Sequence, residues 1–415
     1  MTSTLRVGVN YTPTRGWFHH WLDFDLDEVG ADLDSIAALG LDHVRVFPLW
    51  PLLQPNRTLI RPAAIQQVVS VVDAAAARGL DTSVDVLQGH LSSYDFLPSW
   101  VTGWHRRHLF TDPDVVEAQE QLTAALGEAL AGRPGFVGLT VGNETNQFAH
   151  PYHPDHHRLT TSDTDVWLKR LLRVAQAAAP GGLHCHSFDD DVWFRDDSAV
   201  TPDHAVRHGD VTTVHSWVFT GVSKRYAYPH PAYGWFARYL VELAAAWSPD
   251  PARPVWLQEV GAPVPHVPAA SVAEFTEQTM TNLVSSPELW GVTWWCSHDV
   301  DRTLADFPEL EYSLGLLTAD RQPKPAADVV RRLVPELRRR PRAHARPAVV
   351  LGGSSDAAIQ PSQTAPGSAL FDRWVRLAED GEPPAIVLAR DVHDDQLLAA
   401  RGIQSLIESD GSRIW

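Results

Sequence analysis

Two glutamates, Glu144 and Glu259, each stand at the end of an apolar run that is typical of a buried strand. Glu144 closes the stretch FVGLTVGNE, and Glu259 lies in PVWLQEVGAP. The sheet fixes the backbone of a parallel strand, so a carboxylate at its carboxyl end can face a crevice, where α/β barrels hold their chemistry. Alone, either glutamate would be interpreted as an exposed residue or a helix cap. Together they predict two carboxyl groups that meet at the mouth of one barrel.

A carboxyl pair of this kind suits the cleavage of a glycosidic bond. Cleavage with retention requires a carboxylic acid that protonates the leaving oxygen and a carboxylate about 5 Å away that attacks the anomeric carbon. Inversion requires a wider gap, which leaves room for a water molecule. If the two glutamates end strands four and seven of an eight-strand ring, their side chains can face one another across its mouth.

The elements that would position this pair alternate regularly along the chain. Between residue 6 and about residue 340, short β-branched runs alternate with longer helical patterns, which is typical of strand–helix–strand units and a parallel sheet. Eight strands are predicted, at residues 6–12, 43–49, 81–87, 136–144, 181–188, 211–217, 254–261 and 290–299. Eight such units favour a closed (β/α)8 TIM barrel over an open doubly wound sheet. A nucleotide-binding fold is disfavoured, because no Gly-rich phosphate loop follows the first strand.

Helical apolar stripes are expected between the strands. They fall at residues 27–39, 63–78, 114–130, 167–179, 235–247, 273–284 and 326–337, with a weaker pattern at 196–209. Three connections are longer than a barrel requires, at residues 88–112, 145–165 and 218–233. All three follow strands, so we expect them to wall a pocket on the carboxyl face.

The pattern divides the chain into three parts. Residues 1–340 are the expected catalytic barrel, residues 341–347 a basic, proline-containing linker, and residues 348–415 a small C-terminal α/β appendage of unknown role. The formal net charge of -17 argues against a nucleic-acid partner, because phosphate backbones require clustered Lys and Arg.

Composition also bears on location. No apolar run approaches the ~20 residues of a membrane span, and the first residues, MTSTLRVGVNYTP, lack the pattern of a secretory signal. Cys185 and Cys296 lack metal-ligand spacing, and we expect buried free thiols. These features predict a cytoplasmic protein.

The pair Asn143–Glu144 ending the fourth strand, with Glu259 ending the seventh, resembles the catalytic motifs of retaining glycoside hydrolases of clan A, most nearly family 5. The resemblance covers about residues 6–335. It implies a double displacement in which Glu144 is the acid/base and Glu259 the nucleophile. It implies neither a cofactor nor a metal.

Three further positions match this family residue by residue. Arg45 on strand two resembles the arginine that supports the nucleophile, although a structural ion pair would also explain a charge in an apolar strand. Asn143 resembles the asparagine that binds the sugar 2-hydroxyl. His215 on strand six resembles the histidine near the nucleophile, with a satisfied core histidine as the alternative.

The aromatic positions match less closely. Trp295 resembles the platform tryptophan that ends strand eight, but Trp294 would take that role if the register were shifted by one residue. Two residues after the histidine the family usually has a tyrosine, and this chain has Trp217 instead. Tyr226 or Tyr228 from the following loop could supply the missing hydroxyl.

The opening GVNYTP and the stretch at residues 89–100, which contains His90, look more like the mannan- and mannoside-cleaving members of family 5 than like its cellulases. We therefore expect an exo-acting β-mannosidase that takes a short oligosaccharide or glycoside. The alternatives within the family are a β-glucosidase and an endo-mannanase or cellulase. The predicted substrate-binding residues are Asn143, Arg45, His215, Trp295, Trp217, His90 and Asp299.

Two hypotheses from other classes stay open. A metal-dependent hydrolase on the same barrel would use His184 and His186, which a strand places on one face, or a second histidine group. That second group comprises His150, His153, His156 and His157. A noncatalytic sugar-binding barrel is the other hypothesis, and the presence of both glutamates argues against it.

Overall fold

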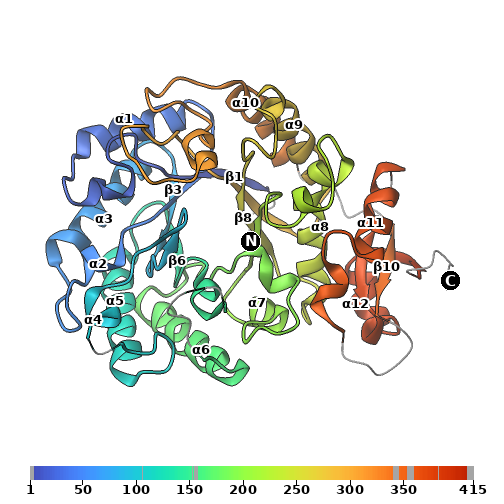
Figure 1. The fold of residues 1–415 in the computed structure, drawn as a ribbon, viewed down its shortest axis with the longest axis horizontal. Coiled ribbons are helices and arrows are strands. Elements are labelled where there is room, and N and C mark those ends of the chain that lie inside the picture. The colour runs from blue at the N-terminus through green and yellow to red at the C-terminus, as the bar shows by residue number, and fades with distance from the viewer. Residues whose placement is uncertain are drawn as a thin grey trace.

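Seven parallel strands form the central sheet of this computed structural model, which describes residues 4–104, 106–151, 153, 158–339, 345–352, 359–381 and 383–408. Their order across the sheet is β6-β3-β2-β1-β9-β8-β7. The strands are β1 (Arg6–Asn10), β2 (His43–Val46), β3 (Asp81–Asp85), β6 (Phe136–Thr140), β7 (Thr212–Ser216), β8 (Val255–Val260) and β9 (Leu289–Trp294). The sheet curls into a ring surrounded by helices (Figure 1). The predicted TIM barrel is confirmed.

The predicted fifth strand, at residues 181–188, closes the ring between β6 and β7 without forming a regular strand. On the β6 side, Cys185 donates its N–H to the Leu139 carbonyl and forms a single bridge with Thr140. On the β7 side, the N–H of His184 is bound by the Asp210 carboxylate at 2.8 Å. A side chain there takes the place of a strand carbonyl, so the ladder is interrupted. We call residues 181–188 the closing segment.

Helices pack around the ring, one after most strands. They are α1 (Leu26–Ala37), α2 (Trp50–Leu53), α3 (Pro62–Ala76), α4 (Ser99–Thr102), α5 (Pro113–Leu130), α6 (Thr161–Ala178), α7 (Pro202–Arg207), α8 (Pro231–Trp247), α9 (Val272–Leu283) and α10 (Pro325–Arg338). The prediction placed the start of α6 six residues too late. Thr160 and Asp163 form a capping box there, which stabilises a polar first turn that the apolar pattern does not mark. The weak pattern at 196–209 corresponds to the short helix α7.

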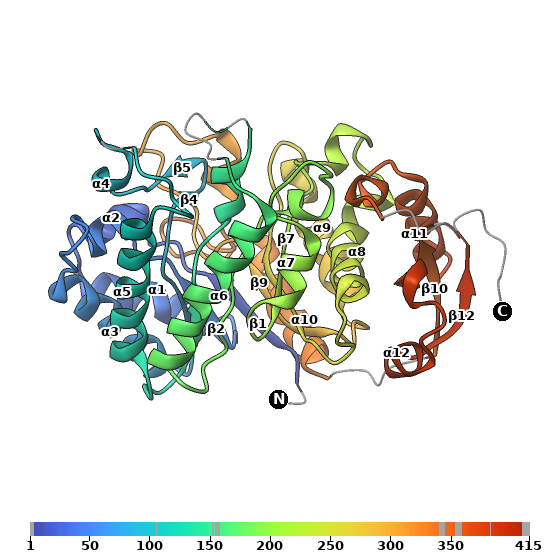
Figure 2. The same ribbon diagram turned by 90° about the horizontal axis from the view of Figure 1, so that it is seen from below.

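Short elements fill the connections. The antiparallel hairpin of β4 (His90–Leu91) and β5 (Tyr94–Asp95) lies after β3. The short 3-10 helices are η1 (Trp17–Trp21), η2 (Thr145–Ala149), η3 (Asp190–Trp193), η4 (Val222–Lys224), η5 (Ala269–Ser271), η6 (Glu309–Ser313), η7 (Pro361–Thr364) and η8 (Ala389–Asp391). In Figure 2 the hairpin and α4 lie at one end of the barrel, beyond the carboxyl ends of the strands.

A second parallel sheet, in the order β11-β10-β12, forms the C-terminal appendage. It comprises β10 (Arg346–Leu351), β11 (Ala385–Leu388) and β12 (Ile403–Ile407), with the helices α11 (Ala369–Glu379) and α12 (Asp395–Ala400). β10 begins inside the stretch predicted as a linker, of which residues 341–344 lie outside the described residues. Figures 1 and 2 both show the appendage beside α8.

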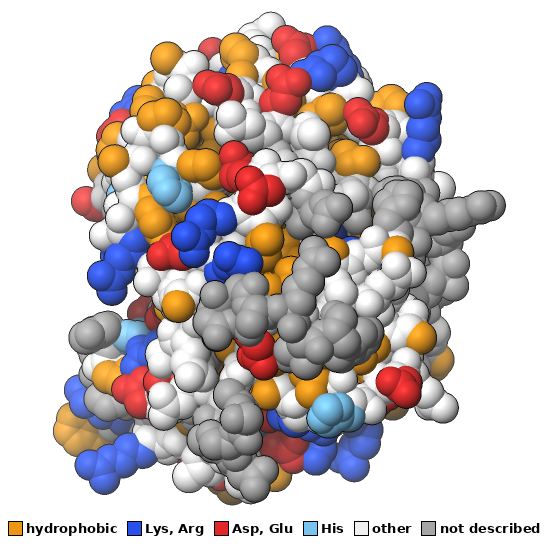
Figure 3. Space-filling view, turned by 90° about the vertical axis from the view of Figure 1, so that its right-hand side faces the viewer, with side chains coloured by type: hydrophobic (Ala, Val, Ile, Leu, Met, Phe, Trp, Pro, Cys, Tyr) orange, Lys and Arg blue, Asp and Glu red, His pale blue; other side chains and the backbone are white. Residues whose placement is uncertain are grey.

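Buried charges join the appendage to the barrel. Arg346 of β10 forms ion pairs with Glu242 of α8 and with Glu288, and the side chains of all three are less than 10% exposed. On the outer face of the appendage, acidic and basic side chains are interspersed over the residues that are described (Figure 3). Within those residues, no helix is long and apolar enough to cross a membrane.

Candidate active site

Glu144 and Glu259 meet at the carboxyl end of the barrel. One carboxylate oxygen of each, together with a ring nitrogen of His215, lies within 4.8 Å of the others. Both glutamates line a cavity of about 490 Å³, whose walls come from the connections after β3, β6, the closing segment, β7 and β9. The separation fits the ~5 Å of a retaining pair and is shorter than the roughly 6.5–9.5 Å of an inverting pair.

Local backbone features aim these side chains at one another. Glu144 follows β6 at a left-handed position, with a φ of 44°, and caps the short helix η2. Such a conformation is costly for a residue with a side chain and is found at functional sites. Between β7 and β8 the register shifts at Val214/His215, so that His215 pairs directly with Glu259. A shift of this kind re-aims the following side chain.

Arg45 lies beneath the pair and holds Glu259. Its Nη1 donates to Glu259 at 2.8 Å, and its Nη2 donates to the amide oxygen of Asn143 at 2.6 Å. Asp85 of β3 accepts two hydrogen bonds from the same guanidinium, at 2.8 and 2.6 Å. Both interpretations of Arg45 therefore apply, since it supports the glutamate and forms a structural ion pair. Arg45 is fully buried, so it contacts Glu259 and not the cavity.

Sequence analysis missed Asp85. The only signal for it is an acidic residue inside the apolar run DTSVDVL. A fully buried carboxylate is tolerated when it is paired and hydrogen-bonded, and Asp85 is paired with the positive charge of the Arg45 guanidinium.

Asn143 is fixed on both sides of its amide group. While its oxygen accepts from Arg45, its nitrogen donates to the His90 carbonyl at 2.8 Å. An amide nitrogen carries two hydrogens, so one donor remains for a ligand in the cavity, which Asn143 lines. His90 lines the same cavity and is paired through Nδ1 with Asp95 at 3.0 Å.

His215 connects the two glutamates. Its Nδ1 lies 2.6 Å from Glu144 and 3.4 Å from Glu259, and its Nε2 lies 3.3 Å from the Gln258 amide oxygen. Gln258 donates its own N–H to Thr140, so its oxygen accepts from Nε2. Burial alone would lower the pKa of His215, but Glu259 and Glu144 outweigh this and raise it. Like Arg45, His215 is buried below the cavity surface.

The two carboxyl groups titrate together with this histidine. Burial would raise the pKa of Glu144, but the hydrogen bond from His215 brings it below its ordinary value. Burial and the neighbouring Glu144 raise the pKa of Glu259, against the opposing effects of His215 and Arg45. These directions favour a positively charged His215 beside an ionised Glu144, joined by a hydrogen bond along which a proton can move.

Trp217 takes the place of the expected tyrosine. Its indole Nε1 donates to Glu259 at 3.3 Å, on the carboxylate oxygen that Arg45 does not hold. Tyr226 and Tyr228 do not supply this contact. The Tyr226 hydroxyl donates to Asp372 of the appendage, and the Tyr228 ring packs against Tyr233.

Trp295 lines the cavity, as predicted from the unshifted register. Trp294 is buried at the end of β9, and its carbonyl accepts from the Asn10 side chain at 3.3 Å. The structure does not bring Asp299 to the cavity. Its carboxylate is held by Lys324 at 2.8 Å and by the Gly315 N–H at 2.9 Å. Through these two contacts Asp299 holds the connection after β9 in place. Its charge is paired with Lys324 and does not face the cavity.

An acidic wall was not predicted. Asp189, Asp190 and Asp191 follow the closing segment and line the cavity, and Glu311 lines it from the connection after β9. Burial raises the pKa of Glu311 to about 7. The run DDD directly after a predicted strand was the available signal, because side chains at that end of a barrel strand face the mouth.

Of the histidines proposed for a metal site, His186 is buried against the Phe188 ring, outside the group with metal-ligand spacing, and the other described ones have other partners. His184 accepts the Leu139 N–H and donates to the Ala179 carbonyl, which leaves its ring without a free nitrogen. His150 and His153 pair with carboxylates, and His156 and His157 lie outside the described residues. Over the described part of the chain, the group with metal-ligand spacing is Glu144, His215 and Glu259.

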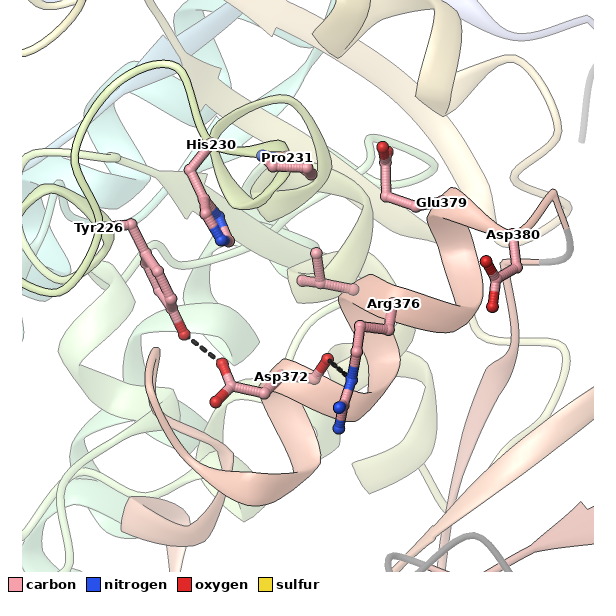
Figure 4. A pocket seen from close by; sticks show the side chains of 8 residues that line it. Tyr226, His230, Pro231, Asp372, Arg376, Glu379 and Asp380 are labelled. Carbon is pink, nitrogen blue, oxygen red and sulfur yellow. Dashed lines mark hydrogen bonds between the residues drawn. The ribbon is translucent and has the colours of Figure 1, made fainter.

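A second cavity, of about 450 Å³, lies between α8 and α11 (Figure 4). Tyr226 and His230 border it from the barrel, with their rings stacked at 4.3 Å, and Asp372 and Arg376 border it from the appendage. The carboxylates there belong to the exposed face of α11. This cavity has no counterpart of the Arg45–Glu259 arrangement among its described residues, so the first cavity is the candidate active site.

Comparison with solved structures identifies the family, whereas no protein-family model and no curated protein matches the chain. A GH5_18 enzyme from Streptomyces cattleya, in a Glu-to-Ala variant complexed with Manβ1-4GlcNAc, is 56% identical over 98% of this chain and 99% of that one, with a TM-score of 0.94. A corresponding variant complex from Bifidobacterium longum is 41% identical over 99% and 96%, with a TM-score of 0.93.

A more distant structure shares the fold. An exo-β-1,4-mannosidase from an Opitutaceae bacterium is 22% identical over 92% of this chain and 69% of that one, with a TM-score of 0.78. The 56% and 41% identities extend over nearly the whole chain, so they show membership of the same family as well as a shared fold. The geometry of the carboxyl pair agrees with that membership. The chain belongs to the GH5_18 group of family 5 glycoside hydrolases, retaining enzymes that act on β-linked sugars.

Proposed function

We propose that this enzyme is an exo-acting β-mannosidase that releases mannose from short β-mannosides such as Manβ1-4GlcNAc. The observation that carries the reaction type is the carboxyl pair within 4.8 Å at the bottom of one cavity. Support for the sugar comes from the two GH5_18 enzymes, which were crystallised with Manβ1-4GlcNAc. The cavity volume of about 490 Å³ suits a ligand of one or two sugar units, within the roughly 300–1,000 Å³ of small-molecule sites.

The mechanism follows from the contacts of the pair. Glu259, oriented by Arg45 and Trp217, attacks the anomeric carbon while Glu144 protonates the leaving oxygen, and the glycosidic bond breaks. His215 supplies that proton to Glu144 across the 2.6 Å hydrogen bond when the substrate displaces water from the cavity. Glu144, now a carboxylate, then takes a proton from water, whose oxygen attacks the anomeric carbon and releases Glu259.

Asn143 and Trp295 are the residues we assign to the bound mannose. The remaining N–H of Asn143 is positioned beside Glu144 to donate to the sugar 2-hydroxyl. Trp295 presents a flat apolar face in the cavity wall, on which the C–H face of a sugar ring packs. The 2-hydroxyl of mannose is axial, so the Asn143 contact also bears on the choice between mannose and glucose.

A panel of 4-nitrophenyl β-mannoside, β-glucoside and β-galactoside tests the sugar, with kcat/KM as the readout. The mannoside should be hydrolysed at least tenfold faster than the others. Exo action is tested with Manβ1-4GlcNAc and a manno-oligosaccharide, from which chromatography should detect free mannose as the first product. A faster β-glucoside, or the release of internal fragments, would favour the β-glucosidase or endo-mannanase alternative. The anomeric form of the first product, followed by NMR, should be β.

The cytoplasm is the proposed site of action. Support comes from the two cysteines, Cys185 and Cys296, which are both free and buried. Thiols of this kind persist in a reducing compartment. Cell fractionation with an activity assay tests this proposal, and activity confined to the medium or an envelope fraction would contradict it.

A further inference from the structure

Asp190 is a buried carboxyl group in the cavity wall that the mechanism above does not use. It is the first residue of η3, is 1% exposed, and lines the catalytic cavity. Its Oδ2 lies 2.5 Å from the Thr220 hydroxyl oxygen. The same hydroxyl oxygen lies 2.7 Å from the Trp217 carbonyl oxygen. Asp190 is thus connected through one hydroxyl group to the residue that contacts Glu259.

The single hydroxyl proton of Thr220 links the state of Asp190 to the hydrogen bond of the Trp217 carbonyl. A hydroxyl group has one hydrogen to donate, and a carbonyl oxygen can only accept. If Thr220 donates to the Trp217 carbonyl, the 2.5 Å contact is a hydrogen bond only when Asp190 carries a proton and donates it. An ionised Asp190 would require the proton of Thr220 for itself and would leave the Trp217 carbonyl without it.

The surroundings of Asp190 also favour its neutral form. Among the described residues, no cationic side chain forms an ion pair with it, and an unpaired buried charge is costly. Burial raises its pKa to about 8, with the neighbouring carboxylates adding to the effect and Thr220 and His215 opposing it. The titratable groups around it are Asp189, Asp191, Glu144, His150 and Lys224 on the cavity, and His215 beneath it.

The connection from Asp190 ends at the nucleophile. Thr220 follows Trp217 by three residues, and its hydroxyl and N–H both bond the Trp217 carbonyl, so it fixes the turn from which the indole ring projects. That indole donates to Glu259 at 3.3 Å, which is already at the long end of the range for an N–H···O hydrogen bond. Movement of the turn would therefore change how Glu259 is held.

We propose that Asp190 is a positioning residue that acts as a neutral carboxylic acid, donating to Thr220 and thereby holding Trp217 against Glu259. The proposal rests on the assignment of Glu259 as the nucleophile. When Asp190 ionises, the Thr220 hydroxyl turns toward it, the Trp217 carbonyl keeps only the longer hydrogen bond from the Thr220 N–H, and turnover falls. Asp190 thus contributes to the alkaline limit of activity.

Isosteric and truncating variants separate this role from a merely structural one. Asp190→Asn keeps a donor that cannot ionise, so it should lower kcat less than threefold at pH 6.5, and its activity should not share the wild-type decline around pH 8. The ratio of Asn-variant kcat to wild-type kcat should rise up to about tenfold between pH 6.5 and 9, because one pH unit above its pKa a carboxyl group is about 90% ionised. Asp190→Ala should lower kcat by roughly 10- to 100-fold, with a smaller change in KM.

Thr220 provides the second half of the test. Thr220→Val should reproduce the loss in Asp190→Ala, and the double variant should be no slower than either single variant, because both remove the same connection. Thr220→Ser keeps the hydroxyl and should retain most of the activity. Asp191→Asn removes a neighbouring negative charge that helps to raise the pKa of Asp190, so it should move the alkaline limb to lower pH without abolishing it.

Two kinetic results would overturn the proposal. The first is an alkaline limb that is the same in the wild type and in Asp190→Asn, and the second is an Asn variant as slow as the Ala variant. A carboxyl ¹³C NMR titration of the full chain, with the Asp190 signal identified by its absence in Asp190→Asn, needs no substrate. It should show a neutral carboxyl group at pH 7, and an ionised one at pH 6 would also overturn the proposal. If no β-mannoside is hydrolysed, the proposed function fails while this titration still decides the state of Asp190.

Discussion

His215 Nδ1 lies 2.6 Å from a carboxylate oxygen of Glu144, so a histidine of β7 and the glutamate after β6 share one proton at the bottom of the cavity. This contact lowers the pKa of Glu144 despite its burial. The group that donates the proton in the reaction is therefore a pair of residues, His215 and Glu144, and not one glutamate alone. The pH dependence of the enzyme should therefore change when the histidine is replaced.

Replacing His215 by Asn should move the alkaline limb of kcat/KM to lower pH. In the wild type the shared proton is lost at the raised pKa of His215, whereas in the variant it must reside on Glu144, a carboxylic acid with a lower ordinary pKa. The expected result is an optimum at lower pH, together with a lower maximal kcat because the proton supply is lost. A profile on a 4-nitrophenyl glycoside between pH 4 and 9 measures both. An unshifted alkaline limb would contradict the proton sharing.

Replacing Glu144 by Gln should slow turnover by about 10² to 10⁴, because general acid catalysis is removed. The loss should be smallest for substrates whose leaving group needs no protonation, such as a 2,4-dinitrophenyl glycoside. Glu259→Ala, in contrast, should abolish hydrolysis of good and poor leaving groups alike. Measuring kcat/KM on a series of aryl glycosides distinguishes the two roles, and an equal leaving-group dependence in both variants would contradict the assignment.

Replacing Trp217 by Phe should lower kcat by about tenfold. The variant keeps an aromatic ring but loses the indole N–H that Glu259 accepts, and a hydrogen bond to a charged group contributes roughly 1.5–3 kcal/mol. Trp217→Tyr offers a hydroxyl donor from the same position and should recover part of the loss. Measured melting temperatures check that both variants are folded. Equal kcat values for the Phe and Tyr variants would show that the donor is not used.

Replacing Arg346 by Met should destabilise the chain by about 3 kcal/mol. Arg346 pairs with Glu242 and Glu288, and removing the cation of a buried pair leaves uncompensated charge, which typically costs 3–5 kcal/mol. The lower value is expected because Arg238 continues to pair with Glu242 at 2.6 Å. Urea unfolding measures the change.

Arg331 supplies a matched control for this measurement. It pairs with Asp328 on the surface of α10, where both side chains are more than half exposed. Arg331→Met should change the free energy of unfolding by less than about 0.5 kcal/mol. A similarly small effect at Arg346 would show that the appendage is not held by its buried charges.

Glu144 and Glu259 could be selected from the sequence because each ends an apolar run, and strand periodicity places such a residue at the barrel mouth. Asn143 and Trp295 followed from the same strands, and their positions in the cavity agree. Asp299 was misplaced, since the sequence gives no sign that Lys324, from a later segment, takes its charge. The irregular closing segment was also missed in detail, because its ladder is interrupted where the Asp210 side chain takes the place of a strand carbonyl.

Local patterns alone determined the ring of strands, the helices between them and the two glutamates, because burial periodicity and turn residues are properties of neighbouring positions. Contacts between distant residues were decided only in three dimensions. They include the burial of Asp85 under Arg45, the indole of Trp217 in place of a tyrosine hydroxyl, and the carboxyl group of Asp190 beside Thr220. Each depends on which side chains fill the space between strands, and that is set by packing across the whole barrel.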